Sequence, residues 1–179
     1  IKLIKSSRVV TLDPLDGPRE INDALRGDGS FESAMGKLEL LHGAGLGITI
    51  GTCLTKQLIP RLGEWVEYWS ERDVSALFLI RTVPSGRGDF PVPSYEEARA
   101  ALKGIRSRKL VLSCGLEDCC PAGKLAFCVS PDGALRGCPD MERERETIRG
   151  LKEAWKDGFA PFRKSTGCLV NAPRGQTKV

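Results

Sequence analysis

Residues 46–54 read LGITIGTCL, a run that is almost entirely apolar and contains several β-branched side chains. A continuous apolar run of this length predicts a buried strand of a parallel sheet rather than a strand with one solvent-exposed face. In such sheets helices cover both faces, so the sequence on either side of the run is expected to be helical.

Apolar residues recur at helical spacing in the segments before and after this strand. Ser30 is a candidate N-cap, and Gly43 and Gly45 are expected to end the helix that follows it. The inner face of that helix consists of Phe31, Ala34, Met35, Leu38 and Leu41. A second helix is predicted after Pro60, with its inner stripe formed by Leu62, Trp65, Val66 and Trp69.

Three further strands are predicted at residues 7–12, 75–83 and 109–113. Ser94 and Glu97 form a capping box that opens a third helix before the last of these strands. Residues 19–29 are polar and are expected to be irregular. The resulting β-α-β-α-β-α-β order predicts an α/β fold with right-handed parallel crossovers, which amounts to less than half of an eight-unit barrel.

Functional groups in parallel α/β folds lie at the carboxyl ends of the strands. Here those ends carry residues 16–17, 52–57 and 81–88. The sequence contains neither a GxGxxG nor a GKS/T phosphate loop, which argues against nucleotide-phosphate binding. His42 is the only histidine, so a Ser-His-Asp set would have to use it, and its place at a helix end favours a solvated side chain.

Five of the seven cysteines lie between Cys114 and Cys138, in the stretch CGLEDCCPAGKLAFCVSPDGALRGC. The SPDG sequence at residues 130–133 is a turn between two short, partly apolar flanks, which predicts a β-hairpin. The hairpin would bring Cys120 close to Cys138, and Cys114 could join them. Converging thiolates of this kind hold zinc or an iron–sulfur cluster, and the spacing does not separate the two.

Disulfide bonds and isolated buried thiols are the alternatives to a metal site for these cysteines. An odd count of seven argues against a secreted disulfide framework, and the cysteine usage favours a reducing, cytoplasmic compartment. Cys53 and Cys128 lie in apolar or strand-like surroundings and are interpreted as buried thiols. Cys119 and Cys120 are adjacent, so only one of them is expected to point into a shared site. The absence of a CxxC pair counts against an ordinary zinc ribbon.

Composition excludes several classes of function. The net charge of +4 is spread along the chain without a basic block, so nucleic-acid binding is not indicated. The sequence contains no apolar run near the roughly 20 residues that a membrane span requires. Because the chain opens with Ile1 and stops soon after Cys168, we expect it to be a piece of something longer.

A set of short segments follows in a fixed order along the chain: Leu15-Asp16-Gly17-Pro18, Arg26-Gly27, Ser30-Phe31-Glu32, LHGAGLGITIGTCL at 41–54, VPSGRG at 83–88, Cys120-Pro-Ala-Gly, Ser130-Pro-Asp-Gly, Cys138-Pro and IRGLKEAWKDG at 148–158. In this order the segments resemble the radical S-adenosylmethionine enzymes that carry a SPASM or twitch extension. The resemblance runs from about Val9 to Cys168. It implies a partial (β/α) barrel over residues 1–113, followed by a small cysteine-rich β-hairpin plus helix over residues 114–179 that binds an auxiliary cluster.

The resemblance also implies roles for individual residues. Cys114, Cys120 and Cys138 would ligate an auxiliary [4Fe–4S] cluster. Cys168 would be its fourth ligand, or would begin a second cluster. Asp16, Gly17 and Arg26 would lie beside S-adenosylmethionine, whose ribose hydroxyls and charged aminoacyl tail need polar partners.

The sequence departs from the family pattern in four places. The CxxxCxxC loop of the radical-generating cluster is not within this chain, so the chain alone is expected to be inactive. Pro14 replaces a serine before Leu-Asp-Gly, Leu58 stands where the family usually has asparagine, and the paired cysteines of a second cluster do not follow Cys168.

By resemblance, the intact enzyme would form a 5′-deoxyadenosyl radical and modify a peptide or protein, with electrons from a flavodoxin or ferredoxin. Family members that act on haem or other cofactor precursors are an alternative. A non-catalytic module with structural zinc in the hairpin is the hypothesis from a different class.

Overall fold

The computed structural model describes residues 11–82, 91–113, 116, 127–129 and 135–138. The chain divides into two compact units, Ile1–Leu116 and Glu117–Val179. The sequence placed the boundary between residues 113 and 114, and the assignment of the two parts as a barrel and a cluster domain stays a prediction. Each unit is described by itself.

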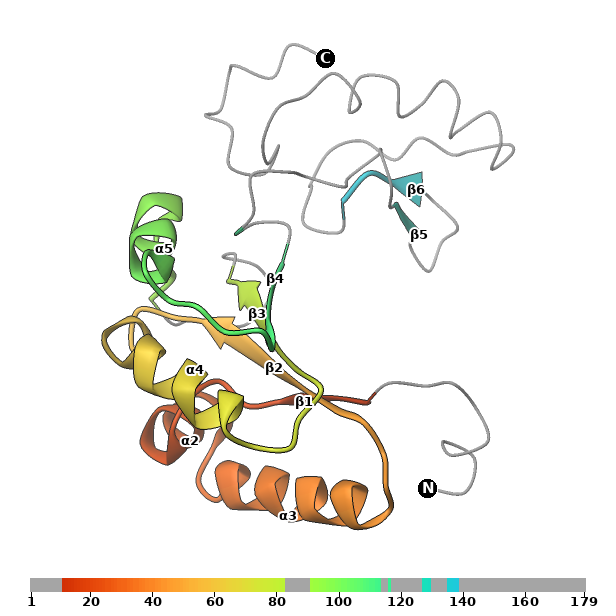
Figure 1. Ribbon diagram of the computed structural model, residues 1–179. Coiled ribbons are helices and arrows are strands. Elements are labelled where there is room, and N and C mark those ends of the chain that lie inside the picture. Colours follow the sequence, from red (N-terminus) through yellow and green to blue (C-terminus); the bar gives the residue numbers. More distant parts are fainter. Residues whose placement is uncertain (1–10, 83–90, 114–115, 117–126, 130–134, 139–179) are drawn as a thin grey trace. The chain divides into compact units, whose positions relative to one another are not determined.

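The first unit is built on a parallel sheet, as predicted (Figure 1). Its strands are β1 (Thr11–Pro14), β2 (Ile48–Leu54), β3 (Ala76–Arg81) and β4 (Leu110–Leu112). They pair in the order β1-β2-β3-β4, and every pairing is parallel. The α/β class is therefore confirmed, and all four carboxyl ends lie along one edge of the sheet.

Helical segments connect these strands. They are α2 (Arg19–Arg26), α3 (Ser30–Gly43), the 3-10 turn η1 (Ile59–Arg61), α4 (Leu62–Ser70) and α5 (Tyr95–Leu102). The predicted inner stripe of α4 is confirmed, since its four residues are all buried. The capping box of α5 is confirmed as well: the Glu97 N–H donates to Ser94 Oγ over 3.1 Å and the Ser94 N–H donates to Glu97 Oε2 over 2.6 Å.

The hydrophobic core lies on one face of the sheet. Ile48, Ile50 and Leu54 of β2 and Leu77 and Leu79 of β3 point into it. The helices contribute Leu38, Trp65, Val66, Trp69 and Ala98 to the same cluster. The alternating strand residues point the other way, because successive side chains of a strand face opposite sides.

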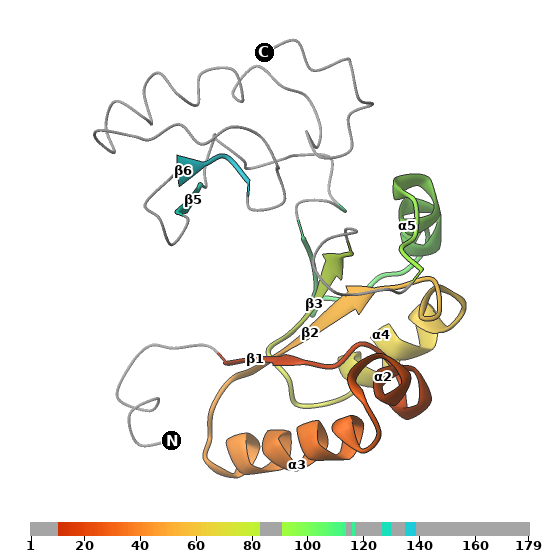
Figure 2. The same ribbon diagram turned by 180° about the vertical axis from the view of Figure 1, so that it is seen from behind.

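That opposite face is apolar but only partly covered. It carries Leu12, Thr49, Cys53, Phe78, Ile80 and Val111, with Leu12 53% and Val111 46% exposed. Within the described residues the helices thus pack on one face, whereas the apolar strands had suggested helices on both. Figure 2, the view from behind, shows the same arrangement of α2, α3 and α4 beside the strands. One-sided cover of a parallel sheet is typical of a sector of a (β/α) barrel, whose strands turn their other face inward.

Two expectations for residues 19–30 are wrong. Residues 19–26 form α2 instead of an irregular segment. Ser30 is the first residue of α3, and Gly29, with φ +77°, takes the cap position. The backbone N–H groups at the start of α3 donate to the side chain of Asp23 instead. Asp23 accepts from Phe31 N at 2.7 Å and from Gly29 N at 3.2 Å. The hydrogen bond from Phe31 lowers the pKa of Asp23.

The first strand was predicted at 7–12, and its described part, Thr11–Pro14, ends two residues later than predicted, while residues 7–10 lie outside the described residues. In the second unit, β5 (Cys128–Val129) and β6 (Leu135–Arg136) pair antiparallel. The predicted turn at 130–133 between them lies outside the described residues, as does the predicted helix at 148–158. Across the residues that are described, we find no helix with the length and apolar character needed to cross a membrane.

Asp13 introduces a pH dependence into the first unit. It pairs with Ile50 on the helix-facing side of β1, and its Oδ2 atom is buried without a hydrogen-bond partner in the described structure. Burial raises the pKa of Asp13 above its ordinary 3.8, and Lys37 partly opposes the rise. The folded chain therefore holds the proton of the Asp13 carboxyl more tightly than the unfolded chain does. As a result, the free energy of unfolding falls as the pH rises through the range in which Asp13 ionises.

We expect Asp13→Asn, which cannot ionise, to lack this loss. Relative to the wild type, its free energy of unfolding should increase by only about 0.3 kcal/mol between about pH 4 and about pH 7, because solvent screens a side chain that is only half-buried. Urea unfolding over this pH range measures the difference. The exposed Asp28 supplies the control, since Asp28→Asn is the same chemical change at an exposed position and leaves the Asp13 carboxylate in place. An Asp13→Asn difference that is independent of pH would contradict the prediction.

Candidate functional site

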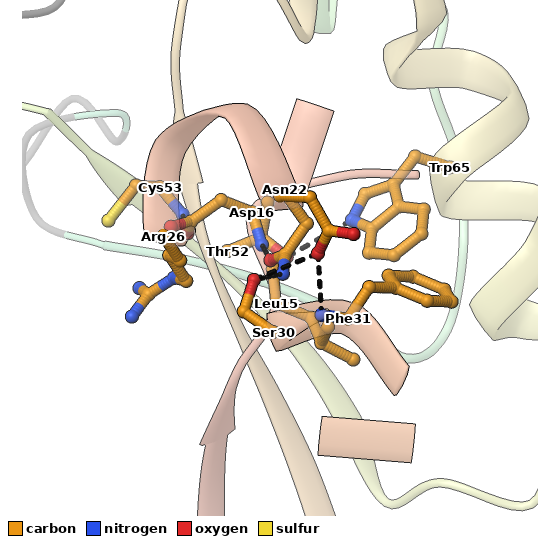
Figure 3. Close-up of polar contacts among 10 residues, drawn as sticks. Leu15, Asp16, Asn22, Arg26, Ser30, Phe31, Thr52, Cys53 and Trp65 are labelled. Atoms are coloured by element: carbon orange, nitrogen blue, oxygen red, sulfur yellow. Dashed lines mark hydrogen bonds and ion pairs between the residues drawn. The ribbon is translucent and has the colours of Figure 1, made fainter. Parts of the chain in front are cut away.

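Asp16 occupies the carboxyl end of β1 and is the centre of a polar network (Figure 3). Its side chain is 7% exposed, and both carboxylate oxygens are bonded. Oδ1 accepts from the backbone N–H of Cys53 at 2.8 Å, and Oδ2 accepts from Nε of Arg26 at 2.6 Å. The carboxylate thus ties the end of β1 to the end of β2 and to α2.

Asn22 holds the backbone of the same residue. Its Oδ1 atom accepts from the Asp16 N–H at 2.9 Å, and its Nδ2 group donates to Ser30 Oγ at 2.9 Å. Ser30 Oγ in turn donates to Asp23 Oδ1 at 2.9 Å. Asn22 has no exposed surface, so this chain of hydrogen bonds joins the β1 end to the α2–α3 junction inside the protein.

Hydroxyl side chains tie the other strand ends together. Thr52 Oγ1 donates to the Leu15 carbonyl at 2.5 Å and accepts from Trp65 Nε1 at 3.1 Å. Thr82 Oγ1 donates to the Leu54 carbonyl at 2.7 Å. Ser113 Oγ accepts from the Arg81 N–H at 2.9 Å. One hydroxyl therefore bridges each pair of neighbouring strands at the carboxyl edge.

Arg26 and Cys53 face outward from this network. The Arg26 side chain is 37% exposed, and Asp16 is its polar partner in the described structure. Figure 3 shows its guanidinium and the Cys53 thiol extending away from Asn22 and Ser30. Burial and the nearby Asp16 carboxylate raise the pKa of Cys53 to about 11, so its thiol stays protonated at neutral pH. A protonated thiol is a poor metal ligand, which agrees with the interpretation of Cys53 as a structural residue.

Gly17 is required by the shape of the turn after Asp16. Its φ is +145°, and a Cβ atom there would lie 3.1 Å from Ile21 Cγ2 and 3.2 Å from Leu58 Cδ1. We expect Gly17→Ala to lower the free energy of unfolding by about 1–3 kcal/mol, through backbone strain and displaced side chains.

Urea unfolding measures this cost. Gly36→Ala is the matched control, because Gly36 lies inside α3 with open space around it. That change should stabilise the chain by about 0.5–1 kcal/mol, since alanine favours a helix more than glycine does. Equal effects of the two substitutions would show that the Gly17 turn is not strained by a side chain.

The structure brings Asp16, Gly17 and Arg26 together at one strand end, where the sequence had placed them. Of the predicted cluster ligands only Cys138 is described, and it is half-buried. Cys114, Cys120 and Cys168 lie outside the described residues, and so does Cys119. The described part of the chain contains no group of three or more metal-ligating side chains, so the ligand set stays a prediction.

The sequence reasoning did not identify Asn22 or Trp65 as part of the site, and it named Thr52 only within the strand end at residues 52–57. Asn22 sits in a segment that was expected to be irregular, and its only sequence signal is the i, i+4 spacing to Arg26. Thr52 and Trp65 were placed correctly on a strand and a helix, but the bond between their side chains depends on how those elements pack.

Comparison with curated proteins identifies relatives of this chain. It is 30% identical over 163 residues to the protein of Mycolicibacterium smegmatis named "Mycofactocin maturase MftC", with 77% of this chain and 41% of that protein covered. It is 41% identical over 147 residues to the protein of the same name from Mycobacterium tuberculosis, with 70% of this chain and 37% of that protein covered. No family model matches the sequence.

These relatives are longer than the chain, which spans about two fifths of their length. The first unit ends at Leu116, so a match to 77% of the 179 residues extends into the second unit. The similarity therefore includes residues of the unit with the parallel sheet and residues of the unit that contains most of the cysteines. The chain is a relative of the mycofactocin maturases, and its resemblance to the radical S-adenosylmethionine enzymes with a SPASM- or twitch-type extension is confirmed.

Proposed function

We propose that this chain is part of a radical S-adenosylmethionine enzyme that modifies a peptide. The similarity to proteins named mycofactocin maturase, which extends from the parallel sheet into the cysteine region, carries the proposal. The one-sided helical cover of the sheet supports its assignment to a partial (β/α) barrel. The peptide or protein substrate, the flavodoxin or ferredoxin electron donor and the cytoplasmic location belong to the proposal for the intact enzyme.

The cofactor site is proposed at the carboxyl edge of the sheet. The residues there fit the polar end of S-adenosylmethionine, because the guanidinium of Arg26 is partly exposed while the carboxylate that orients it is buried. Arg26 would donate hydrogen bonds to an acceptor on the ligand, and Asp16 and Gly17 would shape the turn that holds Arg26. When bound with its iron–sulfur cluster, S-adenosylmethionine would supply the 5′-deoxyadenosyl radical.

The auxiliary cluster is proposed in the cysteine-rich segment at residues 114–179, held by Cys114, Cys120, Cys138 and Cys168. Four cysteine thiolates are the donor set that a [4Fe–4S] cluster takes. The half-buried position of Cys138, two residues after β6, fits a ligand that is shielded from solvent. Ligation would also link parts of the chain that are far apart in the sequence, and metal ligation of this kind contributes to folding.

Metal analysis of the full chain tests this assignment. Purified without oxygen, the wild type is expected to contain about four iron atoms per chain and to absorb visible light. The variant with Cys120→Ala and Cys138→Ala should lose both signals. Cys128→Ala is the matched control, because Cys128 lies on β5, which pairs with β6, and is not one of the proposed ligands.

Two results would contradict the cluster. One zinc ion per chain with a colourless protein would identify a structural metal module instead. Iron that survives in the double variant would assign the cluster to different cysteines.

A further inference from the structure

We propose that Asn22 is a positioning residue for the cofactor site: it fixes the Asp16 turn, and through that turn it aims the guanidinium of Arg26 at the ligand. The inference rests on the proposed function, because it assigns a role within the same site. Asn22 itself would not touch the cofactor.

The burial of Asn22 is unusual for its helix. Asn22 is 0% exposed and is the fully buried residue of α2, although the helix also carries the apolar residues Ile21, Ala24 and Leu25. A buried amide costs free energy unless it is hydrogen-bonded, so a position that required only packing would favour an apolar side chain. Asn22 uses its carbonyl on Asp16 and its amino group on Ser30, each over 2.9 Å.

The geometry of α2 places Asn22 and Arg26 on one face of the helix, because they are four residues apart. Both bind Asp16: Asn22 accepts its backbone N–H, and Arg26 donates to its carboxylate. The turn is thereby held to α2 at two points, and neither bond alone would fix both the position and the direction of the carboxylate.

The carboxylate of Asp16 is already occupied within the protein. Its two oxygens accept from Cys53 and Arg26, and its side chain is 7% exposed, which leaves little of it for a ligand. The groups that can reach a ligand are the outer nitrogens of Arg26. Their direction depends on the carboxylate that they flank, and therefore on Asn22.

Nuclear magnetic resonance of the arginine side chains in the full chain tests the inference directly. In the wild type the Nε–H signal of Arg26 should be shifted downfield and ordered by Asp16. In Asn22→Ala this signal should move toward the position of a solvated arginine and lose its order. Ser30→Ala is the control, because it removes the other partner of Asn22 while the bond to Asp16 remains.

Calorimetric titration with S-adenosylmethionine adds a functional reading. Asn22→Ala is expected to weaken binding by about tenfold, and Ser30→Ala by about twofold or less. If the wild type does not bind S-adenosylmethionine but the Arg26 signal depends on Asn22, the proposed cofactor site fails and the positioning role stands. If Asn22→Ala lowers stability but leaves the Arg26 signal and the affinity unchanged, Asn22 is structural and the inference is overturned.

Hydrogen exchange covers the case in which Asn22→Ala does not fold. In the wild type the Asp16 N–H should exchange as slowly as the amides of β2, because its acceptor has no exposed surface. Rapid exchange of the Asp16 N–H would show that the bond to Asn22 is not maintained, and would overturn the inference without any variant.

Discussion

Replacing Thr52 by valine is expected to lower the free energy of unfolding by about 2–4 kcal/mol. The hydroxyl of Thr52 donates to the Leu15 carbonyl and accepts from the indole N–H of Trp65, and Thr52 itself has no exposed surface. Valine has nearly the same shape but leaves both groups buried without this partner. Each buried group that loses its hydrogen bond costs about 1–3 kcal/mol.

Urea unfolding of the full chain measures the change. Thr49→Val is the matched control on the same strand, since Thr49 is half-buried on the opposite face and its hydroxyl makes no hydrogen bond within the described structure. That substitution should alter stability by about 0.5 kcal/mol or less. If the two valine variants were equally stable, the hydroxyl of Thr52 would not be what joins α4, β2 and the end of β1.

Replacing Asp16 by alanine is expected to lower the free energy of unfolding by about 2 kcal/mol and to weaken S-adenosylmethionine binding by about tenfold or more. The Cys53 N–H would lose its acceptor, and Arg26 would lose the carboxylate that orients it. The partial exposure of Arg26 limits the cost in stability, because water can solvate the guanidinium after the change.

Urea unfolding gives the first quantity and calorimetric titration the second. Asp28→Ala supplies the control, because Asp28 is an exposed acid in the loop after α2. It should leave both quantities close to those of the wild type. If Asp16→Ala binds S-adenosylmethionine as tightly as Asp28→Ala does, the Asp16–Arg26 pair is not part of the cofactor site.

The regular part of the fold could be predicted because local signals agreed with the final packing. The apolar run of β2 was expected at 46–54 and is observed at 48–54. The third strand was expected at 75–83 and is observed at 76–81. In both strands the residues that face the helices are the buried ones, and the sequence at the start of α5 fixes its capping box.

The segment before α3 could not be predicted for a physical reason. In α2 the apolar residues at helical spacing are only Ile21 and Leu25, and the fully buried residue is Asn22, so the hydrophobic period is too short to identify the helix. The cap of α3 comes from Asp23, which belongs to the preceding helix, and local rules assign caps only to the adjoining residue. Pro14 is the last residue of β1, and a proline in a sequence argues against a strand at that position. An edge strand such as β1 nevertheless tolerates proline.

The residues of the candidate site were named from the sequence, but the contacts between them were not, and their role in binding a cofactor stays a prediction. Asp16, Gly17 and Arg26 followed from a family resemblance, and the structure places them together. Both carboxylate oxygens of Asp16 accept hydrogen bonds within the protein, from Arg26 and Cys53. These contacts join segments that are far apart in the chain, so the spacing of residues in the sequence cannot reveal them.

The order of the sheet has a consequence for how the chain acquires its structure during synthesis. Each strand pairs with the strand that precedes it in the sequence, so the spatial order β1-β2-β3-β4 is also the order of translation. A strand leaving the ribosome therefore finds its partner already made, and each addition closes a loop of only one helical unit. Growth by successive units keeps one edge open for the next strand, so the newest edge is the one that would be exposed to wrong pairing if translation paused.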